Sequence, residues 1–290
     1  MITSTQPSTV DAVGQHYDEL DRFYREVWGE HVHHGLWITG DESPETAAVQ
    51  LLERVAHAAR LQPGEQVCDV GCGYGAPARW IADRFDAAVT GLTVSAEQYH
   101  RAKDQSGPDG PTFLLQDWLA NDLPSASFDV VIFIESLSHM PDQRRAIREA
   151  ARVLRPGGRL VIAAWMTDEW PRRWMARHII EPICREGQLP GMPSATDVQR
   201  TLVEVGLQLD RFEDLSAQVQ KTWDVVIRRV VWGVIRTPSY RRYLMDKAQQ
   251  NRRFALTLIR LWIGYRIGAI RYGLFAAHKP GGAGDPSEPG

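Results

Sequence analysis

A carboxylate followed by glycines at every second position is the part of this sequence best suited to chemistry. Asp69 begins the run Asp-Val-Gly-Cys-Gly-Tyr-Gly, which follows an apolar stretch over 65–70 and precedes a helical pattern starting near Ala76 and Pro77. Glycine tolerates a positive φ and has no Cβ, so a ligand can lie against the backbone at a helix N-terminus. The run therefore predicts a ligand-binding loop between a strand and a helix, although the glycines alone do not identify the ligand.

Three further stretches follow this loop in order. They are 89–95 (Val-Thr-Gly-Leu-Thr-Val-Ser), 116–118 (Gln-Asp-Trp) with 128–131 (Phe-Asp-Val-Val), and 154–161 (Leu-Arg-Pro-Gly-Gly-Arg-Leu-Val). Together with the glycine loop they resemble the motifs of S-adenosylmethionine-dependent methyltransferases of the seven-stranded, Rossmann-like class, over residues 65–165. Within that class the chain is most similar to small-molecule methyltransferases of the tocopherol and rebeccamycin type.

The resemblance implies S-adenosyl-L-methionine as the cofactor. It assigns these residues to cofactor binding: Tyr17, Asp69, Gly71, Cys72, Gly73, Thr93, Gln98, Gln116, Asp117, Trp118 and Glu135. Asp69 and the loop would hold the methionine part, while Asp117 would accept from the adenine amino group with Trp118 over the ring. Most of the class has an acid after the second strand for the ribose. This chain has Thr93 there, so Thr93 and Gln98 are expected to share that role.

Methyl transfer is an in-line displacement at an activated sulfonium, so the protein mainly aligns the reactants and can supply a base. His139 follows the fourth expected strand, and a histidine with a pKa of ~6.5 accepts a proton at neutral pH. Shaping the cofactor pocket is its alternative role. Asp168 and Glu169, after the fifth strand, are carboxylate candidates or plain surface acids. Neither the histidine-rich stretch 31–34 nor the cysteines of the loop have further ligands at suitable spacing, so we expect no metal site.

The composition is that of an ordinary globular protein, with 290 residues, 43% hydrophobic, 24% charged and a formal net charge of −3. Three cysteines form no disulfide framework, which indicates a reducing compartment. Neither a signal peptide nor a run of roughly 20 apolar residues is evident. We therefore expect a cytoplasmic protein. An acidic chain without a recognition motif also argues against a nucleic-acid partner.

Strands and helices alternate through the middle of the chain. Strand patterns occur near 66–70, 88–92, 112–115, 129–134 and 159–165, and alternation of this kind predicts a parallel sheet with helices on both faces. The expected fold is α/β, a doubly wound, mostly parallel seven-stranded sheet with an N-terminal helical flap and C-terminal helical lid insertions. The resemblance implies that a late antiparallel hairpin, 207–213 with 272–278, closes this sheet. Thr196 or Asp197 is the expected cap of a helix that ends near Val205, and 216–271 should be helical.

We divide the chain into a flap (1–62), a cofactor-binding core (63–166), a lid with the late strands (167–280) and a disordered tail (281–290). Tryptophans in the lid favour an apolar acceptor. The residues expected to contact it are Trp37, Trp170, Arg173, Trp232, Arg236 and Tyr265. The leading hypothesis is methylation of a small, largely apolar secondary metabolite or lipid-like acceptor.

The C-terminal segment is unusually basic. Residues 220–272 contain twelve Lys or Arg and two acids, so they carry +10 and leave −13 for the rest of the chain. One alternative function is therefore C-methylation of an anionic prenyl diphosphate held by these arginines, with Asp168 or Glu169 as the base. A second is a non-catalytic cofactor-binding or membrane-associated partner protein. Other interpretations of this segment are that it contacts an anionic membrane surface, that it forms a homodimer interface, or that it is a solvated helical face.

Overall fold

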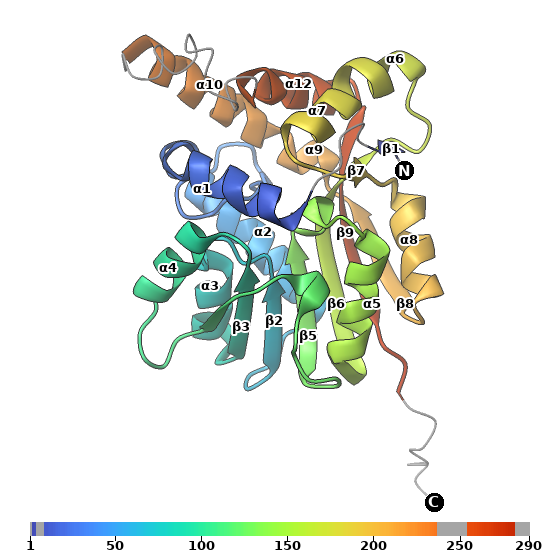
Figure 1. The fold of residues 1–290 in the computed structure, drawn as a ribbon. Coiled ribbons are helices and arrows are strands. Elements are labelled where there is room, and N and C mark those ends of the chain that lie inside the picture. Colours follow the sequence, from blue (N-terminus) through green and yellow to red (C-terminus); the bar gives the residue numbers. More distant parts are fainter. Residues whose placement is uncertain (1, 4–8, 237–253, 282–290) are drawn as a thin grey trace, which may run out of the picture.

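The computed structural model describes residues 2–3, 9–236 and 254–281, and its centre is a seven-stranded sheet (Figure 1). The strand order is β4-β3-β2-β5-β6-β9-β8. The strands are β2 (Gln66–Val70), β3 (Ala88–Thr93), β4 (Thr112–Leu115), β5 (Phe128–Ile134), β6 (Leu154–Thr167), β8 (Gln208–Asp214) and β9 (Ile270–His278). β2 to β6 pair in parallel, whereas β9 runs antiparallel to both β6 and β8. The expected mostly parallel sheet with a late antiparallel pair is confirmed.

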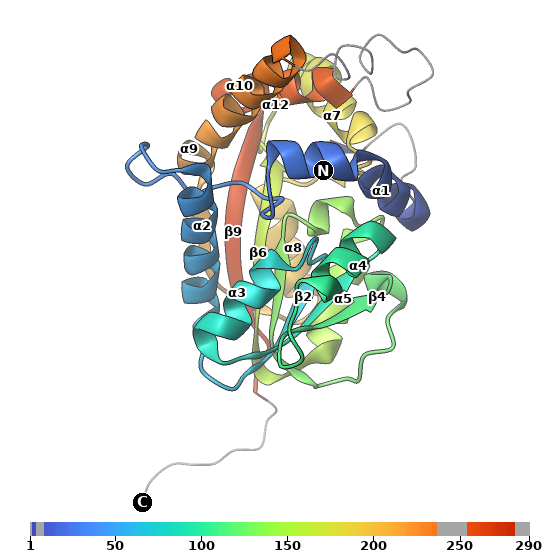
Figure 2. The same cartoon turned by 90° about the vertical axis from the view of Figure 1, so that its left-hand side faces the viewer.

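Helices cover both faces of the sheet (Figures 1 and 2). They are α2 (Pro44–Ala59), α3 (Ala76–Phe85) and α4 (Ala96–Asp104) on one face, and α5 (Gln143–Val153) and α8 (Ala195–Glu204) on the other. Successive strand residues point to opposite faces, so Val67 belongs to the hydrophobic core under α2 and α3, whereas Cys68 belongs to the core under α5 and α8. A parallel strand that is covered by helices on both faces must be apolar on both faces, and β2 meets this requirement.

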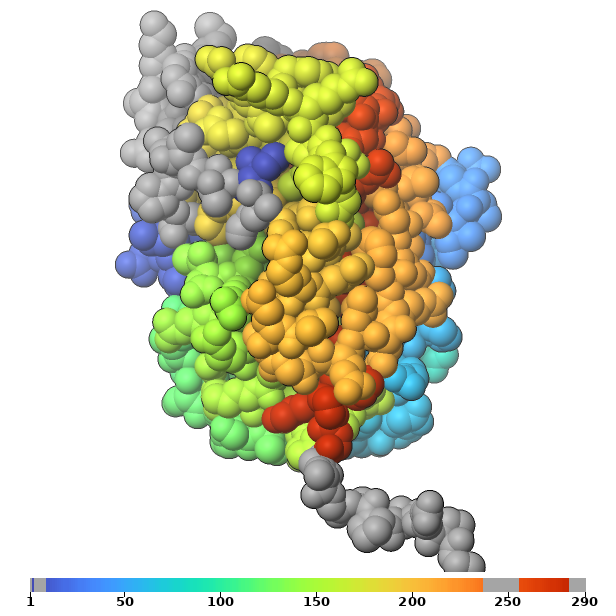
Figure 3. Space-filling view, turned by 90° about the vertical axis from the view of Figure 1, so that its right-hand side faces the viewer, coloured from blue at the N-terminus to red at the C-terminus, as the bar shows by residue number. Residues whose placement is uncertain are grey.

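A helical layer lies above the carboxyl ends of the strands (Figure 1). α1 (Val10–Val27) comes from the N-terminal segment. Between β6 and α8 lie α6 (Arg173–Met175), a π-helical turn η3 (Ala176–Ile180) and α7 (Glu181–Glu186). Between β8 and β9 lie α9 (Ser216–Val219), α10 (Lys221–Arg236) and α12 (Phe254–Arg266). Figure 3 shows the segment after β6 in yellow-green, covering the upper end of the face that α8 and β8 form. None of the helices described is both long and apolar enough to cross a membrane.

Two local features differ from the expectation. The cap of α8 is Ser194, not Thr196 or Asp197, because the Ser194 hydroxyl accepts from the Asp197 N–H while the Asp197 carboxylate accepts from the Ser194 N–H. A two-stranded sheet of β1 (Ile2–Thr3) and β7 (Gly191–Met192) was not expected. The basic residues Arg241, Arg242, Arg252 and Arg253, with Tyr240 and the tail beyond Gly281, lie outside the described residues.

Candidate active site

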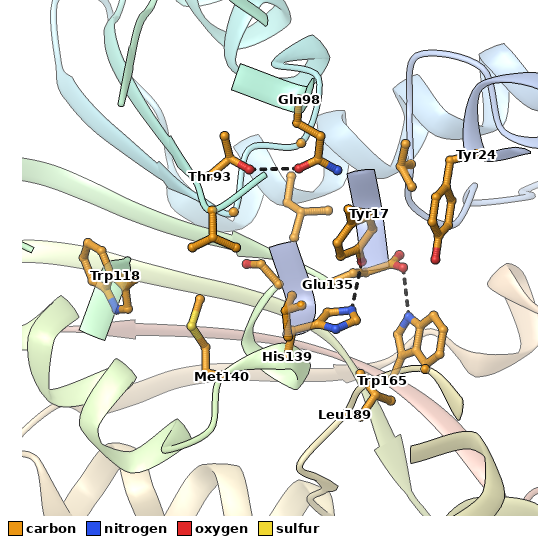
Figure 4. Close-up of a pocket in the computed structure, with 18 of the residues that line it drawn as sticks. Tyr17, Tyr24, Thr93, Gln98, Trp118, Glu135, His139, Met140, Trp165 and Leu189 are labelled. Carbon is orange, nitrogen blue, oxygen red and sulfur yellow. Dashed lines mark hydrogen bonds between the residues drawn. The ribbon is translucent and has the colours of Figure 1, made fainter. Parts of the chain in front are cut away.

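A cavity opens above the carboxyl ends of β2, β3 and β5. β2 and β5 are neighbours in the sheet although α3, β3, α4 and β4 separate them in the sequence, and ligands bind at such switch points. The cavity encloses about 1280 Å³, including its opening to solvent. Strand-end loops form its floor, and α1, α7, α10 and α12 supply further walls (Figure 4). The fold thus gathers most of the expected cofactor motifs around one space.

The glycine loop leaves open backbone and an unpaired carboxylate. Asp69, near the end of β2, is only 1% exposed, and its Oδ2 has no hydrogen-bond partner among the residues described. Burial raises the pKa of this carboxyl from 3.8 to about 7. Gly71 and Gly73 line the cavity with positive φ, and a Cβ on Gly73 would meet no atom within 4 Å. This combination fits the amino-acid part of S-adenosylmethionine, which carries donors for Asp69 and must approach the loop closely.

Cys72 contributes only its backbone to this loop. Its thiol is buried and packs against Gly91 of β3, and its N–H donates to the Leu92 carbonyl. Cys72 is not among the residues that line the cavity, so its assignment to cofactor binding stays a prediction.

Thr93 and Gln98 contact each other, and their shared role at the ribose stays a prediction. Thr93 ends β3, and its hydroxyl donates to Gln98 Oε1 at 2.8 Å (Figure 4). Ser95 caps α4 by accepting from the Gln98 N–H at 3.1 Å, which fixes the start of that helix. Both Thr93 and Gln98 line the cavity, and the bond leaves the amide nitrogen of Gln98 available to a ligand.

Gln116, Asp117 and Trp118 follow β4 and also line the cavity. Asp117 caps a short 3₁₀ turn, η1 (Trp118–Ala120), by accepting from the Leu119 N–H at 2.9 Å. Trp118 is 1% exposed, and its indole donates to the Ala146 carbonyl at 2.9 Å. Its ring is thus mainly part of the core under α5. Gln116 donates to Asp122 at 2.8 Å, so its amide is partly engaged within the protein.

Glu135 collects donors from three distant segments. Its carboxylate accepts from the backbone N–H and the Nδ1 of His34 at 2.7 and 2.9 Å, from the Trp165 indole at 2.8 Å, and from the Tyr272 hydroxyl at 2.9 Å. The Trp223 indole donates to His34 Nε2 at 2.8 Å, which places the ring proton on Nδ1. Burial alone would raise the pKa of Glu135, but His34 outweighs it and holds the pKa at about 2. Glu135 therefore lines the cavity as an ionised group whose partners are already in place.

His139 faces the cavity opposite the flap. It ends a short 3₁₀ turn, η2 (Leu137–His139), and its Nε2 lies 3.0 Å from the hydroxyl of Tyr17 on α1 (Figure 4). Burial and then His16 lower the pKa of His139 from 6.5 to about 4, while Glu135 and the backbone of Gln188 act in the opposite direction. The sequence suggested an ordinary pKa, which is corrected here because the flap buries the ring. The imidazole is neutral at pH 7 and can accept a proton.

The carboxylate alternatives to His139 do not reach the cavity. β6 extends to Thr167, so Asp168 and Glu169 lie beyond the edge of the sheet. Asp168 pairs with Arg271 at 3.4 Å, and Glu169 accepts from the Thr196 N–H at 2.9 Å at the start of α8. Both groups serve local structure, and neither lines the cavity.

The expected acceptor-binding residues also lie outside the cavity lining. Trp170 and Trp232 are 88% and 51% exposed on the outer surface, and Arg173 and Arg236 are exposed beside them in sequence. Trp37 is buried in another place, where its indole donates to the Thr222 hydroxyl at 3.0 Å. Tyr265 packs beneath His34, with ring centroids 5.4 Å apart. Residue type alone suggested these positions. Trp37 and Trp170 lie in loops, and the other four residues lie on helices but do not line the cavity.

The actual walls include residues to which the sequence analysis gave no role in the site. They are Val10, Val13, Tyr24, Trp28, Val32, Met140, Ile183, Leu189 and Leu261. The walls also include His34 of the expected flap and two of the lid tryptophans taken to favour an apolar acceptor, Trp165 and Trp223. Val10, Val13, Tyr17 and Tyr24 share one face of α1 at helical spacing, so this wall was detectable from periodicity. Leu189 lies in a loop, and nothing in the sequence singles it out. Among the described residues no group of three or more His, Cys, Asp or Glu could hold a metal ion.

Comparisons with known proteins agree with this site. Residues 68–162 match a family model described as a methyltransferase domain. The chain is 33% identical over 284 residues to 27-O-demethylrifamycin SV methyltransferase of Amycolatopsis mediterranei, covering 95% of this chain and 99% of that protein. It is 30% identical to the chloroplastic tocopherol O-methyltransferase of Arabidopsis thaliana, covering 92% of this chain and 82% of that protein.

The solved structures extend the likeness to the whole fold. The [4+2]-cyclase SpnF superposes with a TM-score of 0.79 at 26% identity, covering 97% of this chain and 100% of that chain. The same fold has also been solved with S-adenosylhomocysteine bound. With the unpaired carboxylate of Asp69 and the open glycine loop, these findings identify S-adenosyl-L-methionine as the cofactor. The chain belongs to the S-adenosylmethionine-dependent small-molecule methyltransferases and is an enzyme of that family.

Proposed function

We propose that this enzyme methylates a hydroxyl group of a neutral, largely apolar molecule such as a secondary metabolite or a lipid-like phenol. The observation that supports this proposal most directly is the cavity lining, which is mainly aromatic and aliphatic and includes no Lys or Arg among the described residues. The names of the rifamycin and tocopherol relatives support transfer to oxygen. The same lining disfavours a prenyl diphosphate, whose charge would need cationic partners.

The cofactor would lie along the carboxyl ends of β2 to β5. Asp69 and the backbone of Gly71 and Gly73 would hold its methionine part, and Thr93 with Gln98 its ribose. Gln116 and Asp117 would contact the adenine. The bound cofactor supplies an activated methyl group, so the protein's work is alignment and proton removal. Tyr17 and Glu135 would border the reacting end of the site.

His139 is the proposed base. Tyr17 already demonstrates the required geometry, since a hydroxyl oxygen lies 3.0 Å from His139 Nε2. An acceptor hydroxyl that displaced Tyr17 would donate its proton to Nε2 as its oxygen attacked the methyl group. The carboxylate of Glu135 then favours the imidazolium that forms, because it raises the pKa of His139. Closure of α1 over the cavity would exclude water from the reaction.

Calorimetric titration with S-adenosylhomocysteine tests the cofactor residues. Wild-type protein should bind with a Kd near the micromolar range, roughly −8 kcal/mol, and Asp69→Ala should lose this binding. Asp83→Ala, an exposed acid on α3, is the matched control and should bind normally. Loss of affinity in both variants, or in neither, would contradict the assigned role of Asp69.

Methyl transfer from labelled cofactor tests the acceptor class. Neutral phenols and alcohols should accept label, while geranyl diphosphate should not. His139→Gln should lower the rate of transfer by about 10²–10⁴ with cofactor affinity retained, and His100→Gln, at an exposed histidine on α4, should leave transfer unchanged. Because a [4+2]-cyclase shares this fold, cofactor binding without transfer to any acceptor would count against the proposal.

A cytoplasmic location, a homodimer and peripheral contact with a membrane are further proposals, to be measured by cell fractionation and light scattering.

A further inference from the structure

Exposed apolar side chains gather on the helical layer above the cavity. Of the twelve large hydrophobic residues that are exposed in the described chain, six lie on α6, α10 and α12. We call these six the lid surface: Trp174, Val231, Trp232, Ile235, Leu256 and Ile259. Ile235 is 60% exposed and Trp232 is 51% exposed, values that are costly unless another surface covers them.

The three helices place these residues at one end of the molecule. α12 packs between α10 and η3, and Figures 1 and 2 both show this layer beyond the carboxyl ends of the strands. On α10, Arg228, Val231, Ile235 and Arg236 recur at helical spacing on the solvent face. The buried residues of α10 are Thr222, Trp223, Val225 and Val226 near its start, and no residue over 227–236 is buried, so the exposed apolar residues lie on the part of the helix that extends beyond the core.

The same surface carries positive charge that the described residues do not neutralise. Arg173, Arg177, Arg228 and Arg236 are exposed and form no ion pair with any described residue. Arg236 lies over the Trp232 ring at 4.8 Å, a contact that keeps the guanidinium at the surface. Other arginines of the layer differ, since Arg260 pairs with Glu186. The result is an apolar surface flanked by free cations.

The inner side of this layer borders the cavity. Trp223 of α10, Leu261 of α12 and Ile183 of α7 all line it. A molecule leaving an apolar phase at the lid surface would therefore need to pass only this one layer to reach His139. None of the free arginines lines the cavity, so acceptor binding does not account for them.

We propose that the lid surface docks on an anionic lipid bilayer. Tryptophan favours the interface between water and hydrocarbon, and arginine is attracted to anionic headgroups and is released by salt. The unpaired arginines are complementary in charge to anionic headgroups. A second copy of the chain that docked through the same surface would bring arginines against arginines, and these like charges would repel. The charge therefore favours a bilayer over a second copy. Docking itself is independent of methyl transfer, whereas its purpose, delivery of an apolar acceptor, rests on the proposed function.

Vesicle flotation tests the proposal with full-length protein. The probes are vesicles of phosphatidylcholine alone and of phosphatidylcholine with phosphatidylglycerol at roughly 7:3. Wild type should float with the mixed vesicles at low salt only. Each arginine near such a surface contributes about fivefold to partitioning, so Arg173→Gln with Arg177→Gln should weaken binding roughly twentyfold. Trp232→Ala with Ile235→Ala should also weaken it, because the inserted apolar area is lost.

A matched pair of changes on another face provides the control. Val203→Ala with Arg148→Gln removes one exposed aliphatic residue and one exposed arginine from α8 and α5, and should float like wild type. Titration with S-adenosylhomocysteine in every variant separates docking from the methyltransferase site. No preference of wild type for anionic vesicles, or equal flotation of all variants, would overturn the proposal. So would a dimer that the lid-surface variants dissociate in protein that binds no vesicles.

Discussion

Asp69→Asn should stabilise the ligand-free protein while abolishing cofactor binding. The physical reason is that the folded protein buries this carboxyl with one oxygen unpaired, so ionisation is costly there until a ligand supplies donors. Asparagine keeps nearly the same shape but cannot ionise. It therefore removes the cost together with the charge that the cofactor would use.

The magnitude follows from the pKa. Burial moves the pKa of Asp69 from 3.8 to about 7. At 1.36 kcal/mol for each tenfold change, this corresponds to about 4 kcal/mol of stability. Below pH 3.8 both states hold the proton and nothing is lost. As pH rises from 3.8 to about 7 the unfolded state ionises while the folded state stays neutral, so stability falls, and above pH 7 the full cost applies.

Urea unfolding of ligand-free protein at pH 5, 6, 7 and 8 measures this effect. The advantage of Asp69→Asn over wild type should grow with pH and approach about 4 kcal/mol at pH 8. Asp83→Asn, at an exposed position, should show no such trend. A difference that does not change with pH would refute the reasoning, because packing or hydrogen bonding would then explain it without ionisation. Weak binding of S-adenosylhomocysteine by the variant is the functional counterpart.

Four further substitutions test the base, the flap and the glycine loop separately. His139→Gln should lower kcat by about 10²–10⁴ without changing cofactor affinity, and in wild type the acid limb of kcat/KM should lie nearer pH 4 than 6.5, because burial holds the His139 pKa at about 4. Tyr17→Phe should remove the hydroxyl that contacts His139. The KM for the acceptor should rise little, and the pKa of His139, measured by NMR, should change. Gly71→Ala should destabilise the fold, since its Cβ would lie 2.3 Å from that of Ser136, whereas Gly73→Ala should chiefly impair S-adenosylhomocysteine binding in calorimetry. Equal thermal stability of the two alanine variants would contradict this distinction.

The sequence predicted the parts of the site that short-range pattern determines. Asp69, Thr93 and Asp117 each lie at or just after the end of a strand, and parallel strands bring their carboxyl ends to one edge. The other walls of the cavity were not predictable in the same way, since they depend on which face of a lid helix packs inward. Trp223 and Trp232 occupy one helix, yet the first lines the cavity and the second lies outside.

Trp223 and Trp232 also show what residue type cannot supply. Both are aromatic and sit near arginines, so composition treats them alike. They are nine positions apart, which is two and a half helical turns, and therefore they project in opposite directions. A helical-wheel reading would have separated them. No such reading locates Leu189, because its position follows from a loop whose path depends on α7 and β7.

Asp69 is buried and Glu135 is largely buried near the ends of adjacent strands, and their environments give the two carboxylates different roles. Glu135 already accepts four hydrogen bonds. Burial acts to raise its pKa, but His34, with His33, outweighs burial and holds the pKa at about 2 against an ordinary 4.5. Its ionised form thus contributes stability above pH 4.5 that is lost as pH falls toward 2. Asp69 instead has one oxygen that lacks a hydrogen-bond partner among the described residues.

Glu135→Ala should consequently destabilise the protein where Asp69→Asn stabilises it. Truncation leaves donors of His34, Trp165 and Tyr272 buried without an acceptor, at a cost of about 3–5 kcal/mol in urea unfolding at pH 7. Tyr272→Phe removes one of these donors and keeps the charge, so its cost should be nearer 1 kcal/mol. If Glu135→Ala were as stable as wild type, the carboxylate would not be the group that ties the flap to β6 and β9. The contrast between the two carboxylates would then need another origin.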